Sequence, residues 1–209
     1  MKRWETYIYA IVIVLLNIPL MFGGIFAGLV FTSQQNFWQI LTHPFIHVSW
    51  YHLLLDAAAF LLLYTQLAEP SLKRRTVYVT VCGLSSLLAA VLVLPQMNSI
   101  GYCGLSGIGH GLMGICALEM IFANSKDSQN RLIGAISLAI IVGKCGFEAV
   151  TGKMFFGFFH TDLIGSPVAL AHTGGLLGGW VMYFVFNPAL LIPQSLRNFK
   201  KAIVLSKTI

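Results

Sequence analysis

The sequence predicts an all-α membrane protein with six membrane-spanning helices in one domain. Of its 209 residues, 57% are hydrophobic and only 10% are charged, whereas soluble domains carry about 25% charged residues. Six stretches with few or no charged residues approach the roughly 20 residues that a helix needs to cross a bilayer. They cover residues 7–31, 50–68, 77–94, 104–123, 132–150 and 166–186. Because these stretches nearly exhaust residues 1–209, we expect a six-helix bundle whose chemistry is built from helices and short loops.

The first stretch resembles a secretory signal only at its start, where Lys2 and Arg3 precede the apolar run. That run is about twice as long as the apolar region of a signal peptide. Five further apolar stretches follow it. We therefore expect a retained membrane-spanning helix.

Basic residues predict how the spans are oriented. They gather in alternate connections and in both tails, at Lys2, Arg3, Lys73, Arg74, Arg75, Lys126, Arg131, Arg197, Lys200, Lys201 and Lys207. The positive-inside rule places those segments in the cytoplasm, so both termini are expected there. The net charge of +6 follows from this topology and predicts a lipid bilayer, not a nucleic acid, as the partner.

Two basic residues, Lys144 and Lys153, lie instead at or beyond the expected outer end of the fifth span. Lys144 has Glu148 one helical turn later, a spacing that favours an ion pair with a structural role. Glu119, near the inner end of the fourth span, is expected to reach the cytoplasmic interface.

The cysteines do not indicate a metal site. Cys82, Cys103, Cys116 and Cys145 lack a paired spacing such as C-x-x-C, so we interpret them as structural thiols. A disulfide between Cys103 and Cys145, both near outer span ends, stays open. No metal or organic cofactor is expected.

Polar residues within the spans predict a site near the outer membrane surface. An ionisable side chain inside a span costs about 2.5 to 3.5 kcal/mol, which makes it a functional candidate. His52 and Asp56, Ser106 and His110, and His172 fall in the first two turns of the second, fourth and sixth spans. All five lie within roughly 3 to 10 Å of the outer helix ends. Three helices thus bring polar side chains to one depth.

Ser106 and His172 together have the chemistry of a nucleophile and its base. An imidazole that accepts the serine proton allows attack on a carbonyl, and nearby donors stabilise the oxyanion. Ser106 lies at a helix start, where backbone N–H groups lack intrahelical partners. His52 and Asp56, one turn apart, can supply further donors.

Other interpretations of these residues stay open. Ser106 can instead cap its helix, His172 can be a packed histidine, and His52 and Asp56 can satisfy each other. For His110 we consider an orienting role toward His172, a second proton acceptor for Ser106, or packing, and we favour the orienting role.

Small residues predict that the fourth and sixth spans pack closely. They form small-xxx-small rows, which permit close backbone approach in lipid, at Gly107 and Gly111 and at Ala171, Gly175 and Gly179. A serine and a histidine on different helices need that proximity.

Three motifs resemble those of rhomboid intramembrane proteases. Residues 104–107 resemble their G-x-S-G motif, residues 171–176 their A-H-x-x-G-L motif, and residues 42–56 their T-H-x-x-x-H-x-x-x-x-H-x-x-x-N segment. The resemblance implies that Ser106 and His172 form a dyad without a carboxylate. It also implies that His52 helps to form the oxyanion hole and that His47 has a structural role.

Three residues depart from the family pattern. Asp56 stands where asparagine is usual, and is expected either to be protonated or to face another partner such as a histidine. Gln39, after Trp38, replaces an arginine in the first outer loop. His110 replaces an aromatic residue that packs on the catalytic histidine.

Residues 104–111, GLSGIGHG, also resemble the G-L-S-G-x-x-H-G pattern of the rhombosortases. This bacterial branch trims C-terminal glycine-glycine sorting tails from exported proteins. The resemblance implies a serine endopeptidase of the bacterial cytoplasmic (inner) membrane, acting on membrane-anchored proteins. The oligomeric state stays open.

Two other functions are weighed against a protease. The first is an inert rhomboid-like protein that binds membrane clients, although such proteins usually lose the serine or the histidine. The second is a transporter, which predicts ionisable groups near span centres and inverted repeats. Neither feature is apparent in this sequence.

Overall fold

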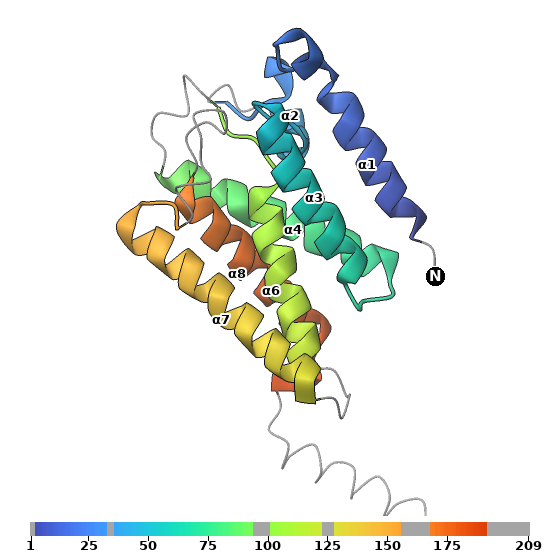
Figure 1. Ribbon diagram of the computed structural model, residues 1–209, viewed down its shortest axis with the longest axis vertical. Helices are drawn as coiled ribbons and strands as arrows, with labels where there is room; N and C mark the ends of the chain where they lie inside the picture. Colours follow the sequence, from blue (N-terminus) through green and yellow to red (C-terminus); the bar gives the residue numbers. More distant parts are fainter. Residues whose placement is uncertain (1–2, 33–35, 94–100, 123–127, 156–167, 192–209) are drawn as a thin grey trace, which may run out of the picture.

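The computed structural model describes residues 3–32, 36–93, 101–122, 128–155 and 168–191, and it is helical almost throughout them (Figure 1). The long helices are α1 (Trp4–Leu16), α3 (Trp50–Gln66), α4 (Leu72–Val93), α6 (Ser106–Phe122), α7 (Ser128–Thr151) and α8 (Ala169–Phe186). The short helices are α2 (Phe37–Thr42) and the 3-10 helices η1 (Ile18–Phe22), η2 (Ala27–Leu29), η3 (His43–Phe45) and η6 (Pro188–Leu191). The prediction of an all-α fold is confirmed.

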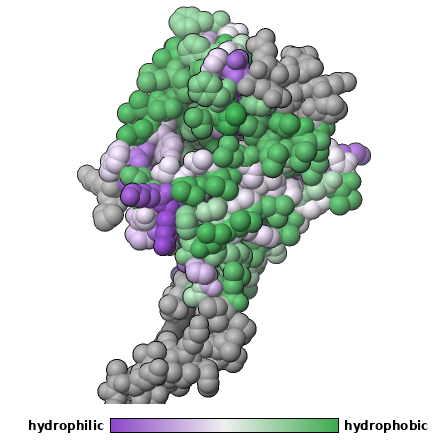
Figure 2. All heavy atoms as spheres, turned by 180° about the vertical axis from the view of Figure 1, so that it is seen from behind, coloured by the Kyte–Doolittle hydropathy of each residue, from purple (hydrophilic) through white to green (hydrophobic). Residues whose placement is uncertain are grey.

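The helices have the length and surface of membrane spans. Among the described residues, four apolar helical segments are long enough to cross a bilayer: Trp4–Phe22, Leu72–Val93, Ser128–Thr151 and Ala169–Phe186. A fifth is present if Phe37–Phe45 and Trp50–Gln66, bent by 90°, count as one span, and α6 is a shorter apolar helix. Hydrophobic side chains cover most of the face in Figure 2. The chain is an integral membrane protein with several spans.

The first span ends earlier than the predicted range of 7–31. Helix α1 stops at Leu16, and after η1 the chain turns at Gly23, whose φ of 72° is in the left-handed region. The buried Asn17 side chain donates to Ile13 O and Phe45 O, both at 2.7 Å. An asparagine that binds two carbonyl groups offers the backbone an alternative to a continuous helix.

Helices α4, α6 and α8 form the centre of the bundle. Helix α3 lies beside α6, α1 packs on the outer side of α3, and α7 packs against α6 and α8 at the opposite edge (Figure 1). The inner helices are in backbone contact, because a Cβ atom added at Gly175 would lie 2.0 Å from Gly107 O. One added at Gly174 would lie 2.4 Å from Ser85 O. The close approach predicted from small residues therefore extends to α4.

A buried ion pair joins α1 to α4. Glu5 is 6% exposed and Arg75 is 3% exposed, and the carboxylate accepts from the guanidinium. Arg75 also donates to Glu69 O at 2.8 Å and to Pro70 O at 2.7 Å. The basic cluster before the third span therefore belongs partly to the folded core.

Several predicted features lie outside the described residues. These are the start of the sixth span before residue 168 and the basic residues Lys2, Lys126, Arg197, Lys200, Lys201 and Lys207. All four cysteines are described, and each is a free thiol, so Cys103 and Cys145 do not form a disulfide.

Candidate active site

The structure brings Ser106 and His172 into hydrogen-bonding contact. Ser106 is the first residue of α6, and its Oγ lies 3.2 Å from Nε2 of the buried His172 on α8. The chain enters α6 through Gly104, whose φ of 109° disfavours other residues. The Gly104 amide donates to His43 O at 3.1 Å, which anchors this turn on the segment before α3.

The second nitrogen of His172 contacts a carboxylate. Glu148 on α7 is fully buried, and its Oε2 lies 2.8 Å from His172 Nδ1. Its Oε1 lies 2.6 Å from Lys144 Nζ, so the ion pair expected from the sequence is present. Oε1 also accepts from the Phe155 amide at 3.2 Å. The resemblance implied a dyad without a carboxylate, whereas the structure places a carboxylate beside His172.

Sequence reasoning missed Glu148 as part of the site. The spacing of four residues to Lys144 was explained by an ion pair within α7. One signal was available, because a carboxylate has more hydrogen-bonding capacity than one lysine uses. A carboxylate predicted near the outer end of an apolar span therefore needs further donors.

His110 joins the same cluster. Its ring is parallel to that of His172, with ring centroids 4.0 Å apart. His110 Nδ1 lies 2.7 Å from Ser106 O, and Nε2 lies 2.8 Å from Lys144 Nζ. Both ring nitrogens thus have partners other than the Ser106 hydroxyl. This geometry favours the orienting role over a second proton acceptor.

His52 and Asp56 form a second group on α3. Asp56 Oδ2 lies 3.3 Å from His52 Nε2 and 3.6 Å from His47 Nε2. Of the two expectations for Asp56, this geometry favours a carboxylate that faces histidines. A Cβ atom added at Gly104 would lie 3.0 Å from His52 Nε2 and 3.1 Å from Asp56 Oδ2. The group therefore packs on the backbone two residues before Ser106.

His47 lies between η3 and α3 and is fully buried. Burial lowers the pKa of His47, because an imidazolium would lose its hydration, and the neighbouring Asp56 carboxylate opposes this shift. Its backbone amide donates to Asn17 Oδ1 at 2.9 Å. These contacts connect the segment before α3 to the end of α1.

Gln39 anchors the segment that contains η2 and α2. Its side chain is buried, and Nε2 donates to Gly28 O at 3.3 Å. Trp38 Nε1 donates to the same carbonyl at 3.2 Å. The backbone carbonyl of Gln39 contacts His43 Nδ1 at 2.9 Å. The residue that departs from the family pattern thus holds η2 against α2 and η3.

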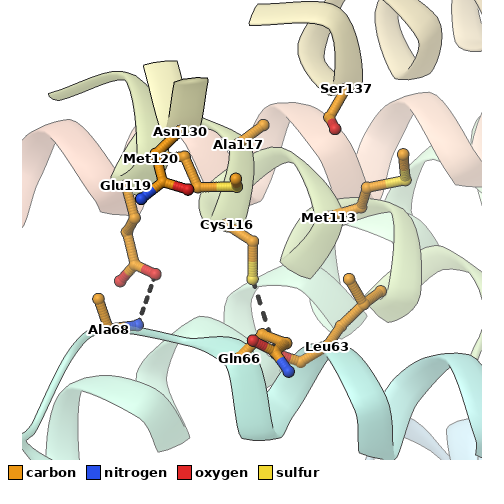
Figure 3. Close-up of a pocket in the computed structure, with 10 residues that line it drawn as sticks. All are labelled: Leu63, Gln66, Ala68, Met113, Cys116, Ala117, Glu119, Met120, Asn130 and Ser137. Atoms are coloured by element: carbon orange, nitrogen blue, oxygen red, sulfur yellow. Dashed lines mark hydrogen bonds between the residues drawn. The ribbon is translucent and has the colours of Figure 1, made fainter. Parts of the chain in front are cut away.

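Glu119 lines a cavity of about 470 Å³ (Figure 3). Ser106 is not among the residues that line it. Its residues come from α3, α6, α7 and the segment after α3. Glu119 accepts from the Ala68 amide at 2.7 Å and from the Glu69 amide at 3.1 Å. These bonds give Glu119 a structural role in holding the end of α3 on α6.

A family model of the rhomboid domain matches residues 34–189. A search of curated proteins found no match, and a search of solved structures found none. The matched residues run from just before α2 to just after α8 and so contain Ser106, Glu148 and His172. They make up most of the chain. The protein therefore belongs to the rhomboid family, whose members are generally intramembrane serine proteases.

Proposed function

We propose that this protein is an intramembrane serine endopeptidase in which Ser106 is the nucleophile and His172 is its general base. The observation that carries the proposal is the 3.2 Å contact between Ser106 Oγ and His172 Nε2. The two side chains come from separate helices whose backbones touch at Gly107 and Gly175. A bundle that brings a helix-start serine and a buried histidine together in this way suits acyl transfer.

The reaction has two stages, formation and hydrolysis of an acyl-enzyme, and each stage includes two proton transfers. As Ser106 Oγ bonds to the substrate carbonyl carbon, its proton passes to His172 Nε2. Collapse of the tetrahedral intermediate breaks the C–N bond, and His172 returns the proton to the leaving amine. Water then attacks the acyl-enzyme by the same sequence and regenerates Ser106.

The oxyanion is proposed to form near the start of α6. The Ser106 amide is one donor, because the first N–H groups of a helix have no intrahelical acceptor. His52 is the second, and its contact with the Gly104 backbone supports this placement. Asp56 is assigned to positioning His52, since its carboxylate contacts His52 at 3.3 Å.

The substrates are proposed to be membrane-anchored proteins cut in or beside their membrane segments. The rhombosortase-like sequence at residues 104–111 favours C-terminal glycine-glycine sorting tails as the substrate class. In support, His110, the residue that distinguishes this sequence, contacts Ser106 O and stacks on His172. The proposed location is the bacterial inner membrane, with both termini cytoplasmic and the site near the outer face.

A catalytically inert rhomboid-like protein is the alternative function. The contact between Ser106 and His172 disfavours it, because an inert protein has no need of a serine hydroxyl aimed at an imidazole nitrogen. Labelling of the folded protein by a fluorophosphonate probe, which reacts with an activated serine, separates the two functions. An unlabelled, folded wild-type protein would support the inert alternative.

The mutational test compares Ser106→Ala and His172→Ala with Ser85→Ala. Ser85 lies in the similar sequence G-L-S-S on α4, but its Oγ donates to Val81 O at 2.6 Å within its own helix. We expect the first two variants to lose probe labelling and cleavage of a membrane-anchored reporter, and Ser85→Ala to keep both. Full activity in either Ser106→Ala or His172→Ala would refute the dyad.

A further inference from the structure

We propose that Glu148 and Lys144 act as a positioning pair that sets the tautomers of His172 and His110. This inference rests on the proposed protease function and assigns two further residues to it. Both residues lie on α7, which contributes neither Ser106 nor His172. One charged pair contacts both histidines, and each of its contacts constrains where a ring proton lies.

The first constraint acts on His172. Glu148 Oε1 accepts from Lys144 at 2.6 Å, so the carboxylate is held in its ionised form by a neighbouring cation. An ionised carboxylate only accepts hydrogen bonds, so the proton in the 2.8 Å contact with Glu148 Oε2 belongs to His172 Nδ1. In the neutral ring Nε2 is then unprotonated and faces Ser106 Oγ. This is the tautomer that a general base requires.

The second constraint acts on His110. A backbone carbonyl only accepts, so the 2.7 Å contact with Ser106 O places a proton on His110 Nδ1. An ammonium group only donates, so the 2.8 Å contact with Lys144 requires an unprotonated His110 Nε2. His110 is therefore neutral, and an uncharged ring stacks on His172 at 4.0 Å. Because His110 is neutral, it adds no further positive charge beside His172 when His172 gains a proton.

Lys144 is placed to replace Glu148 as the partner of His172 Nδ1. Lys144 Nζ lies 3.4 Å from His172 Nδ1, within reach of a hydrogen bond. In the wild-type protein Glu148 accepts from both groups and keeps the His172 proton on Nδ1. Without Glu148, Lys144 donates to His172 Nδ1, and the ring proton moves to Nε2. Nε2 can then no longer accept the Ser106 proton.

The cluster also has the composition of a metal site, since single ligand atoms of His110, Glu148 and His172 lie within 4.8 Å of one another. Lys144 Nζ contacts ligand atoms of two of these residues, at 2.6 and 2.8 Å. The ammonium group therefore supplies the positive charge there and competes with any divalent cation. We assign the cluster to proton positioning for this reason.

The kinetic test uses Glu148→Ala, Glu148→Gln and the double variant Lys144→Met/Glu148→Ala. Loss of the group that fixes a catalytic histidine tautomer removes general-base catalysis, which lowers kcat by roughly 10²- to 10⁴-fold. We expect this loss in both Glu148 variants, with KM for a membrane-anchored reporter unchanged. Removing Lys144 from the Glu148→Ala protein should restore activity at least tenfold, because the competing donor is gone.

Glu5→Gln is the matched control, because Glu5 is also a buried carboxylate paired with a cation, at a distance from Ser106. It should keep the wild-type kcat per folded molecule. A Glu148→Ala protein within threefold of wild-type kcat would overturn the inference. So would a double variant no more active than Glu148→Ala.

A second measurement does not depend on cleavage. Side-chain ¹⁵N chemical shifts distinguish the two neutral histidine tautomers, and we expect protonated Nδ1 in both His172 and His110 of the wild-type protein. A His172 ring protonated on Nε2 would overturn the inference whether or not the protein cleaves. Correct tautomers together with an unreactive Ser106 would instead contradict the proposed protease function and leave the positioning role supported.

Discussion

The imidazole rings of His110 and His172 are stacked, with centroids 4.0 Å apart and an interplanar angle of 6°. His110 lies one turn after Ser106 on α6, so the stack links the helix of Ser106 to the helix of His172. The His110 ring packs against one face of the His172 ring. Its Nδ1 also contacts Ser106 O.

His110→Phe separates stacking from hydrogen bonding. Phenylalanine preserves the flat ring but cannot donate to Ser106 O or accept from Lys144. We expect a roughly 5- to 160-fold loss of kcat, the range that corresponds to about 1 to 3 kcal/mol for two net hydrogen bonds. His110→Ala, which removes the ring as well, should lose more. A His110→Phe protein as inactive as His172→Ala would show instead that His110 is itself a proton acceptor.

Asp56→Asn tests how Asp56 acts. Its Oδ2 contacts His52 and His47, so the carboxylate charge, not a donated proton, is assigned to the site. An amide lacks this charge and holds His52 less firmly. We expect kcat to fall roughly 10- to 100-fold, less than the loss of an entire oxyanion donor. Reporter cleavage by purified protein measures the effect.

Wild-type activity in Asp56→Asn would contradict that assignment. It would show that the group at position 56 acts as a hydrogen-bond donor, a role that an asparagine amide can fill. His47→Gln is a useful companion, because it removes the second imidazole while keeping the carboxylate. We expect this variant to retain more activity than Asp56→Asn.

Gly175→Ala tests the backbone contact between α6 and α8. The added methyl group would lie 2.0 Å from Gly107 O and 2.7 Å from Gly107 C, so the helices must separate. Overpacking of this kind costs about 1 to 3 kcal/mol. We expect a lower unfolding temperature and loss of fluorophosphonate labelling in the protein that remains folded.

Gly146→Ala is the matched control. Gly146 is exposed on α7, and a Cβ atom there meets nothing within 4 Å. Alanine in a helix is favoured over glycine by about 0.8 to 1 kcal/mol. The unfolding temperature should therefore hold or rise. Equal destabilisation by both alanines would show that the helix contact is not the cause.

Glu5→Gln tests the buried pair with Arg75. Removing one partner of a buried ion pair leaves an uncompensated charge and costs about 3 to 5 kcal/mol. We expect thermal unfolding in detergent to shift to lower temperature, with kcat of the folded fraction unchanged. An unchanged unfolding temperature would show that Arg75 is satisfied by Glu69 O and Pro70 O alone.

Hydropathy and local motifs predicted the helices and the meeting of Ser106 with His172. Runs of apolar residues predict where the spans lie. The positions of Ser106 and His172 near the starts of two such runs can be read directly from the sequence. The end of the first span was not predictable in this way. It depends on Asn17, whose side chain binds Phe45 O far along the chain.

Glu148 shows a second limit of sequence reasoning. Its spacing to Lys144 is compatible with an isolated ion pair and with a pair that faces α8. The difference between the two is the rotation of α7 about its own axis, which is set by packing against α6 and α8. No local pattern in α7 reports that rotation. The same holds for His52 and Asp56, whose contact with Gly104 depends on how α3 meets α6.

The backbone contacts among α4, α6 and α8 also limit how the molecule can open. Where main chains touch, as Gly175 does with Gly107 and Gly174 with Ser85, helices cannot slide past each other without collision. Ser106 and His172, the proposed nucleophile and base, are thus carried by a single stiff unit. In the proposed protease, an opening that admits a polypeptide from the lipid would therefore come from the outer helices. Helix α7 is one of them, so its displacement would move Glu148 away from His172 and make catalysis sensitive to closure.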